Sequence, residues 1–352
     1  MDPEEIRAIA RNHWAYQPVS TPALEGAGPH PIDELLARVR PTDLPVAPQA
    51  PARVLVRRAW YALTGLPAPF KESQPWNARL EAEASAKEAL IDGLLASPHF
   101  GEHIGRMWLD VARYADTKGY VFQEDRAYPY AYTYRDWVVG AFNRDVPYDA
   151  FVQRQLAADL LKMPVQEQAA LGFLRVGGRF LNRGHLILDD WIDVTTRGIM
   201  GSTVACARCH DHFSDPFSQA DYYALYGIFD SSVAPVEGPL VGSGMSGEDY
   251  EAFLKEAHAR ADAVHMYLHE SFGDYEPGED RLAFNRQALS VRFGKSLPAA
   301  QEFQRLLREL SQVKATHAGA PPRAMVLRDR PTPRPATIFV RGDPGRKGAV
   351  VA

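Results

Sequence analysis

The sequence predicts an all-α protein, made of a multi-helix domain, a long antiparallel helical hairpin and a short β-prone tail. Three observations support this fold class. Apolar residues between positions 104 and 115 recur at helical spacing, and two heptad stripes follow near the C-terminus. The composition, with 46% apolar, 11% aromatic and 24% charged residues over 352 positions, is typical of a folded globular protein.

The helical stripe predicts one buried face of a helix over residues 101–116. Its members are Ile104, Met107, Trp108, Val111, Ala112 and Ala115. The heptad stripes predict the hairpin, because residues that alternate by four and three form one apolar seam. The first stripe runs from Tyr250 to Leu268 and the second from Phe303 to Val313.

Four segments are expected along the chain. Residues 1–50 form a Pro-rich N-terminal arm, and 51–235 form the helical domain. A Gly/Pro/Ser-rich linker and the hairpin occupy 236–318. The tail, 319–352, is expected to begin a further domain downstream.

Bulk properties exclude some function classes. The formal net charge is −5, and no run of Lys and Arg is present, so nucleic acid is not expected as a partner. No run of about 18 apolar residues appears, so no membrane-spanning segment is expected. The acidic start of the chain lacks the features of a signal peptide.

The stretch "VACARCHDHF" holds the only two cysteines, Cys206 and Cys209, with His210 directly after the second. This C-x-x-C-H spacing is typical of covalent haem c attachment. Each thiol can add to one vinyl group of the porphyrin, and His210 can then bind the iron.

Three other interpretations of this stretch stay open. A thioredoxin-type disulfide would require a βαβ context, which the helical periodicity does not supply. A zinc site could use Cys206, Cys209, His212 and one carboxylate. The pair could also be inert. In the haem interpretation we expect His212 to form a local hydrogen bond, because it lies too close to His210 to reach the opposite haem face.

A helix is expected to begin at Asp189, Asp190 and Asp193, because carboxylates suit a helix N-terminus, and to continue to the cysteines. A paired-carboxylate acid/base site is the alternative role for these residues. Alternating tyrosines upstream predict one face of an extended segment, which either packs on the helices or lines a ligand pocket. They are Tyr128, Tyr130, Tyr132 and Tyr134.

Several long blocks resemble a planctomycete secreted domain family, domain of unknown function 1549. They include "RVLVRRAWYALTGLPAP", "RMWLDVARYADTKGYVF", "TTRGIMG" and "VACARCHDHFSDPFSQADYYALYGIF". The resemblance implies secretion, a haem c enclosed by the helical domain and held at Cys206, Cys209 and His210, and redox work beside a cytochrome c module. Because relatives continue at both ends, we expect this chain to be a fragment of a longer protein or a truncated member of the family.

Further haem contacts are expected from five residues. Met107 is the first candidate for the second iron ligand, because the resemblance places a histidine there in relatives, and His185 is the second candidate. A core methionine and a loop histidine are the alternatives. Arg113, Lys118 and Arg135 could pair with the haem propionates, or could form ordinary salt bridges.

The expected function is an exported c-type haem redox protein, acting in the periplasm or otherwise outside the cytoplasm as the iron-containing module of a larger oxidoreductase. One alternative is a pure electron-transfer or scaffold domain, whose partner is another cytochrome c module. The other is a zinc-stabilised interaction domain. A firm second iron ligand would favour electron transfer, and an open position would favour catalysis.

Overall fold

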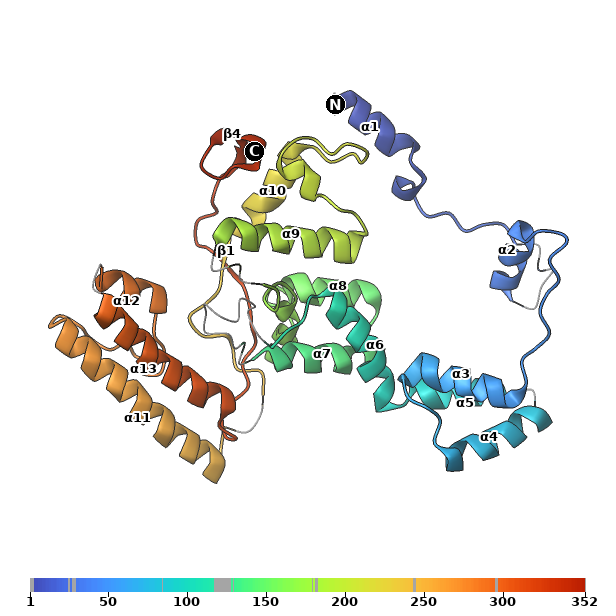
Figure 1. Ribbon diagram of the computed structural model, residues 1–352, viewed down its shortest axis with the longest axis horizontal. Coiled ribbons are helices and arrows are strands. Elements are labelled where there is room, and N and C mark those ends of the chain that lie inside the picture. The colour runs from blue at the N-terminus through green and yellow to red at the C-terminus, as the bar shows by residue number, and fades with distance from the viewer. Residues whose placement is uncertain are drawn as a thin grey trace.

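A computed structural model describes residues 3–24, 26, 30–83, 85–116, 128, 130–178, 180, 183–242, 245–294 and 297–351. The chain is mainly helical, which confirms the coarse fold class (Figure 1). The strands within the described residues are short and form two antiparallel pairs. None of the described helices combines the length and the apolar character that crossing a bilayer requires.

The N-terminal arm carries two short helices, α1 (Pro3–Asn12) and α2 (Pro31–Val39). Helix α2 buries none of its residues, and extended chain connects it to the rest (Figure 1). Tyr16 of the arm touches the ring of Phe217 edge-on, with the ring centroids 6.4 Å apart.

Three helices then form a small unit: α3 (Ala52–Thr64), α4 (Phe70–Ala82) and α5 (Ala86–Leu95). Val56, Trp60, Leu90 and Leu94 form its apolar core. Helix α3 ends at Gly65, whose φ of 69° is the left-handed conformation that a glycine adopts at little cost.

Helix α6 (Pro98–Val111) packs closely on α7 (Ala131–Asn143) through its glycines. A Cβ on Gly101 would lie 2.4 Å from the carbonyl oxygen of Val139. Gly101 and Gly105, which are both buried, therefore form the face of α6 that contacts α7. Met107 lies away from this face and is 54% exposed, so its assignment to a buried apolar stripe is wrong.

A buried polar network joins α6 and α7 to α8 (Tyr148–Ala157). Gln155 is 0% exposed, and its Oε1 accepts hydrogen bonds from Trp108 Nε1 at 2.8 Å and from Tyr134 Oη at 2.6 Å. The 3₁₀ segment η2 (Val165–Leu174) covers the same core, where Gly172 lets the Tyr134 ring approach the backbone. Because Tyr134 lies within α7, the tyrosines from Ala131 onward are helical, and their expected extended conformation is wrong there.

Helix α9 (Gly184–Met200) starts before the acidic cluster and ends before the cysteines. Gly201, with φ 66°, ends it, and the backbone N–H of Ser202 donates to the carbonyl of Thr196 at 3.1 Å. The expected continuous helix from Asp189 to Cys206 is therefore wrong. The cysteines lie on a separate 3₁₀ turn, η4 (Ala205–Arg208), followed by α10 (Gln219–Asp230).

Two long helices, α11 (Glu248–Ser271) and α13 (Leu297–Thr316), pack side by side (Figure 1). They are antiparallel, since Phe253 near the start of α11 shares a cluster with Val313 near the end of α13. At the other end, Leu268 packs with Phe303. The short helix α12 (Arg286–Arg292) lies between them in the chain.

The C-terminal tail folds back onto the helical domain. Strand β2 (Arg328–Asp329) pairs with β1 (Ser232–Val233), directly after α10. Strands β3 (Ala336–Phe339) and β4 (Lys347–Val351) form a hairpin around the 3₁₀ turn η5 (Val340–Gly342), and β3 packs on α10. The β-prone residues of the tail thus reach the neighbourhood of the cysteine turn.

Replacing Gln155 with alanine should lower the free energy of unfolding by about 2 to 4 kcal/mol, because the Trp108 and Tyr134 donors would lose their buried acceptor. Urea denaturation measures this change. Gln153→Ala, at an exposed position of the same helix, is the control and should stay within about 0.5 kcal/mol of the unmodified protein. Equal effects of the two changes would contradict the network's role.

Candidate functional site

The cysteine turn presents two free, exposed cysteines on a short, well-anchored backbone segment. Cys206 and Cys209 are both exposed, and the backbone N–H of Cys209 donates to the carbonyl of Cys206 at 3.2 Å. Ala207, between them, is 0% exposed and packs with Val204 and Tyr223. The buried alanine anchors the turn while both cysteines face outward.

Helix α10 fixes the turn through the backbone carbonyl of Arg208. Tyr223 Oη donates to this oxygen at 3.0 Å and Gln219 Nε2 donates to it at 3.1 Å. The backbone N–H of Gln219 also donates to Asp211 Oδ1 at 2.8 Å. Ser218 and Asp221 form a reciprocal cap at the start of α10, so the residues that hold the turn sit on a well-defined helix end.

Helix α9 holds the same turn from the other side. Asp189 lies 3.3 Å from the Arg208 guanidinium and accepts a hydrogen bond from Tyr222 Oη. Burial, together with this carboxylate, raises the pKa of Tyr222 far above its usual value, so its hydroxyl stays protonated and remains a donor. Asp189 therefore links the cysteine turn to both helices.

The two histidines after the cysteines differ in their surroundings. His210 is exposed, and its Nδ1 lies 2.7 Å from the carbonyl oxygen of Asp211. A carbonyl only accepts, so Nδ1 donates, which in the neutral ring places the lone pair on Nε2. His212 is buried, and its Nδ1 accepts from the backbone N–H of Asp215 at 2.9 Å, the local role expected for it.

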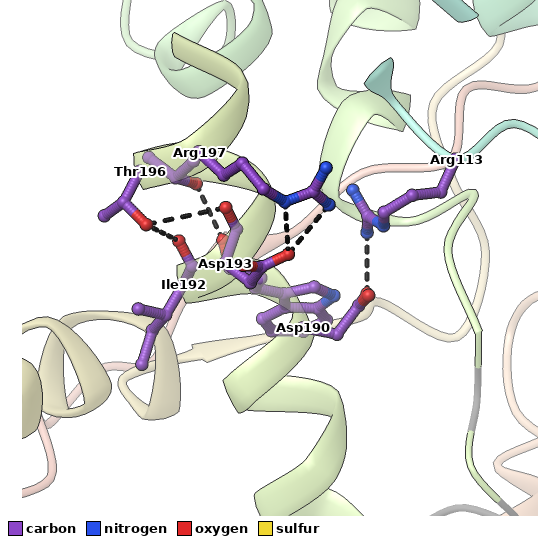
Figure 2. Close-up of polar contacts among 8 residues, drawn as sticks. Arg113, Asp190, Ile192, Asp193, Thr196 and Arg197 are labelled. Carbon is purple, nitrogen blue, oxygen red and sulfur yellow. Dashed lines mark hydrogen bonds and ion pairs between the residues drawn. The ribbon is translucent and has the colours of Figure 1, made fainter. Parts of the chain in front are cut away.

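The acidic cluster of α9 forms ion pairs rather than a helix N-terminal cap. Helix α9 has no acid in its first turn, because it begins at Gly184. Asp190 pairs with Arg113 at 2.6 Å and Asp193 pairs with Arg197 at 2.8 Å, as Figure 2 shows. With Asp189 on Arg208, each acid has its own arginine, so the expected N-terminal role is wrong.

The Arg113–Asp190 pair is largely buried. Its side chains are 18% and 14% exposed, and Arg113 Nε and Nη1 are buried without a hydrogen-bond partner. A Cβ on Gly177 would lie 2.3 Å from Arg113 Nη2, so only glycine allows this approach. Burial raises the pKa of Asp190 more than the Arg113 charge lowers it. Arg113 itself adopts a φ of 57°, a conformation uncommon for a non-glycine residue.

The remaining expected haem contacts are scattered. Lys118 lies outside the described residues. Arg135 is exposed and pairs with its neighbour Asp136 at 2.8 Å. His185 lies in the first turn of α9. Burial lowers its pKa, and the positive charge of nearby Arg208 lowers it further. Met107 is exposed on α6, whose main packing partners are α7 and α3.

The expectation of a metal-binding site built by the chain's own side chains is wrong for the described residues. No group of three or more His, Cys, Asp and Glu side chains is placed there to hold a metal ion. For the zinc alternative the reason is geometric. Cys206 and Cys209 face solvent, whereas His212 is buried with its Nδ1 occupied by backbone N–H groups.

Two parts of the site were missed in the sequence. Tyr222, Tyr223 and Gln219 belong to the quoted block after the cysteines, but nothing in their spacing assigned them to the Arg208 carbonyl or to Asp189. Gly342, in the tail, lies against Cys209 Sγ, and no sequence pattern predicts this contact across a separation of 133 positions. A cavity of about 420 Å³ lies elsewhere, among α3, α4 and α5, and is lined by Trp60 and Trp76 but by none of the expected site residues.

Asp190→Asn should alter the pH dependence of stability. A carboxyl whose pKa is raised by folding stabilises the folded state fully below the unfolded pKa, about 3.9, and that stabilisation is lost as the pH rises through the folded pKa. The stability difference is the free energy of unfolding of the unmodified protein minus that of Asp190→Asn. We expect this difference to decrease as the pH rises from about 3.9 through the raised pKa of the folded state. Urea titrations at several pH values measure the difference. Asp110→Asn, at an exposed position, is the control for loss of one surface charge, and an equal trend in both variants would contradict the assignment.

The comparisons with known proteins give one family. The model of a protein of unknown function, DUF1549 (PSCyt2), matches residues 31–234, from helix α2 to strand β1. No curated protein and no solved structure matches the chain. The match includes the cysteine turn, both helices that hold it and well over half of the 352 residues. The chain therefore belongs to the DUF1549 family of proteins of unknown function.

Proposed function

We propose that this protein is an exported c-type haem redox protein, the haem module of a larger oxidoreductase, with the haem attached through Cys206 and Cys209. The observation that carries the proposal is the cysteine turn itself. Two free cysteines are exposed on one anchored turn, and the next residue, His210, is exposed with its Nδ1 on the carbonyl of Asp211. A metal-ligating histidine commonly donates its other ring N–H to a carbonyl in this way.

The attachment chemistry needs only what the turn offers. Each thiol adds across one vinyl group, so that sulfur bonds to one carbon and the hydrogen ends on the other, and no oxidant or reductant is consumed. When bound, a haem supplies a one-electron redox centre whose porphyrin provides four of the iron ligands. The chain then has to contribute axial ligands only, which requires no cluster of three protein ligands.

The surroundings of the turn support a role in electron exchange. The thiols lie at the surface, so a group attached there keeps an edge accessible to a redox partner such as another cytochrome c module. Arg208 is tied to Asp189, and Arg113 to Asp190, so neither guanidinium is free to bind a substrate without breaking an ion pair. A pure electron-transfer domain is the second candidate function, favoured by this exposure. Haem c attachment follows export in bacteria, so we place the protein outside the cytoplasm, and fractionation of the source cells tests that location.

Expression with cytochrome c maturation machinery should give a protein whose intact mass includes one haem that survives denaturation. Cys206→Ala combined with Cys209→Ala should abolish the covalent haem, because no other thiol exists in the chain. Ser202→Ala, just before the turn, is the matched control and should retain it. A haem-free mass of the unmodified protein under these conditions would refute the proposal.

Three single variants identify the axial ligands. His210→Ala should change the ferrous visible spectrum while the haem stays attached, because the thioether bonds do not involve the imidazole. If Met107 or His185 holds the second position, its replacement by alanine should turn the iron high-spin. Because Met107 is exposed, Met107→Ala should change stability by less than about 0.5 kcal/mol, well below the cost of truncating a core residue. An unchanged spectrum in His210→Ala would exclude it as the proximal ligand.

A further inference from the structure

The C-terminal tail touches one of the two cysteines. A Cβ on Gly342 would lie 2.6 Å from Cys209 Sγ, so the Gly342 backbone closes one side of that sulfur. The same Cβ would lie 3.4 Å from Arg208 Cγ and 3.5 Å from the Arg208 carbonyl oxygen. Cys206 is not among the three nearest neighbours of any glycine in the described residues.

The tail is held in this place by an aromatic anchor on α10. Phe339 packs against Tyr223 and Tyr226, with ring centroids 5.1 and 5.3 Å away. Gln219 Nε2, which also binds the Arg208 carbonyl, lies 3.4 Å from the carbonyl oxygen of Phe339. Tail and cysteine turn thus share the same two α10 residues, Tyr223 and Gln219, and Figure 1 shows the tail beside α10.

The backbone of the tail at this point is fixed in an unusual conformation. Arg341 and Gly342 have φ values of 56° and 73°, so two consecutive residues adopt the left-handed region. Glycine is the residue that adopts it at least cost, and here the missing Cβ also leaves room for the sulfur. Conformation and contact both require glycine at position 342.

We propose that residues 339–342 form a wall of the cysteine site that shields Cys209, so that Cys206 is the first thiol to react with a carbon electrophile and Cys209 the second. This segment lies outside the family match, which ends at residue 234. The proposal deepens the proposed haem attachment by giving its order. It rests on the thiol geometry, so the haem-free protein can test it.

The test is timed alkylation of the folded, haem-free protein with N-ethylmaleimide. Each thiolate sulfur bonds to an alkene carbon, and the neighbouring carbon takes a proton from water. Trypsin then cuts after Arg208 and places Cys206 and Cys209 on separate peptides, so mass spectrometry gives the rate at each position. Cys206 should react at least about threefold faster, because access limits the rate at Cys209. Equal rates, or a faster Cys209, would overturn the proposal.

Two variants in the tail test the cause. Phe339→Ala removes the anchor, and Gly342→Ala forces a methyl group towards Cys209 Sγ, so both should lift the tail and raise the Cys209 rate towards that of Cys206. The Cys206 rate reports on the fold, since general unfolding would raise both. Gly345→Ala is the matched control in the same hairpin, where the nearest atom to a new Cβ is Asp343 Oδ1 at 3.3 Å.

Unchanged rate ratios in both Phe339→Ala and Gly342→Ala, or parallel changes at the two cysteines, would overturn the proposal. Failure of haem attachment would leave these alkylation rates unaffected, so the two proposals can fail separately.

Discussion

The carbonyl oxygen of Arg208 accepts hydrogen bonds from Tyr223 and Gln219, and the direction of both thiols depends on this arrangement. A 3₁₀ turn of four residues has too few internal hydrogen bonds to hold its own shape. Here the buried Ala207 packs into the core, and Tyr223 and Gln219 of α10 bind the backbone of the turn. Cys206 and Cys209 are exposed, whereas Ala207 between them is buried.

Helix α9 extends this constraint through its three acids. Asp189 pairs with Arg208 of the cysteine turn. Asp190 pairs with Arg113, and Asp193 pairs along its own helix with Arg197 (Figure 2). Burying an ion pair is worthwhile for specificity rather than for stability, because desolvation offsets much of the attraction. The Asp189 and Asp190 pairs connect α9 to the cysteine turn and to the segment that carries Arg113, whereas the Asp193–Arg197 pair lies within α9.

The sequence predicted the features that depend on local spacing and missed those that depend on distant contacts. Helical periodicity and the C-x-x-C-H spacing are both local features. The mainly helical fold was predicted from the periodicity. The end of α9 was misplaced because Gly201 was not recognised as a left-handed cap. Met107 was placed in the core because hydrophobicity alone did not show that Gly101 and Gly105 are the residues that contact α7.

The acids of α9 were misassigned for a related reason. A run of carboxylates suits a helix start, but equally suits a set of arginines supplied from elsewhere in the chain. Arg113 and Arg208 are 76 residues before Asp189 and 19 after it, and no periodicity reports such pairing. Because residues 319–352 were expected to begin a downstream domain, the packing of the tail on α10 was not predicted.

The extent of the family match and the extent of the site differ, and this difference bears on how the site works. The match ends soon after α10, yet Phe339 packs on Tyr223, and Gly342 lies on Cys209. The α10 residues that anchor the cysteine turn lie inside the match, whereas the tail residue that contacts Cys209 lies outside it. The cysteine turn therefore belongs to the matched family region, and the proposed limit on access to Cys209 depends on residues beyond that region.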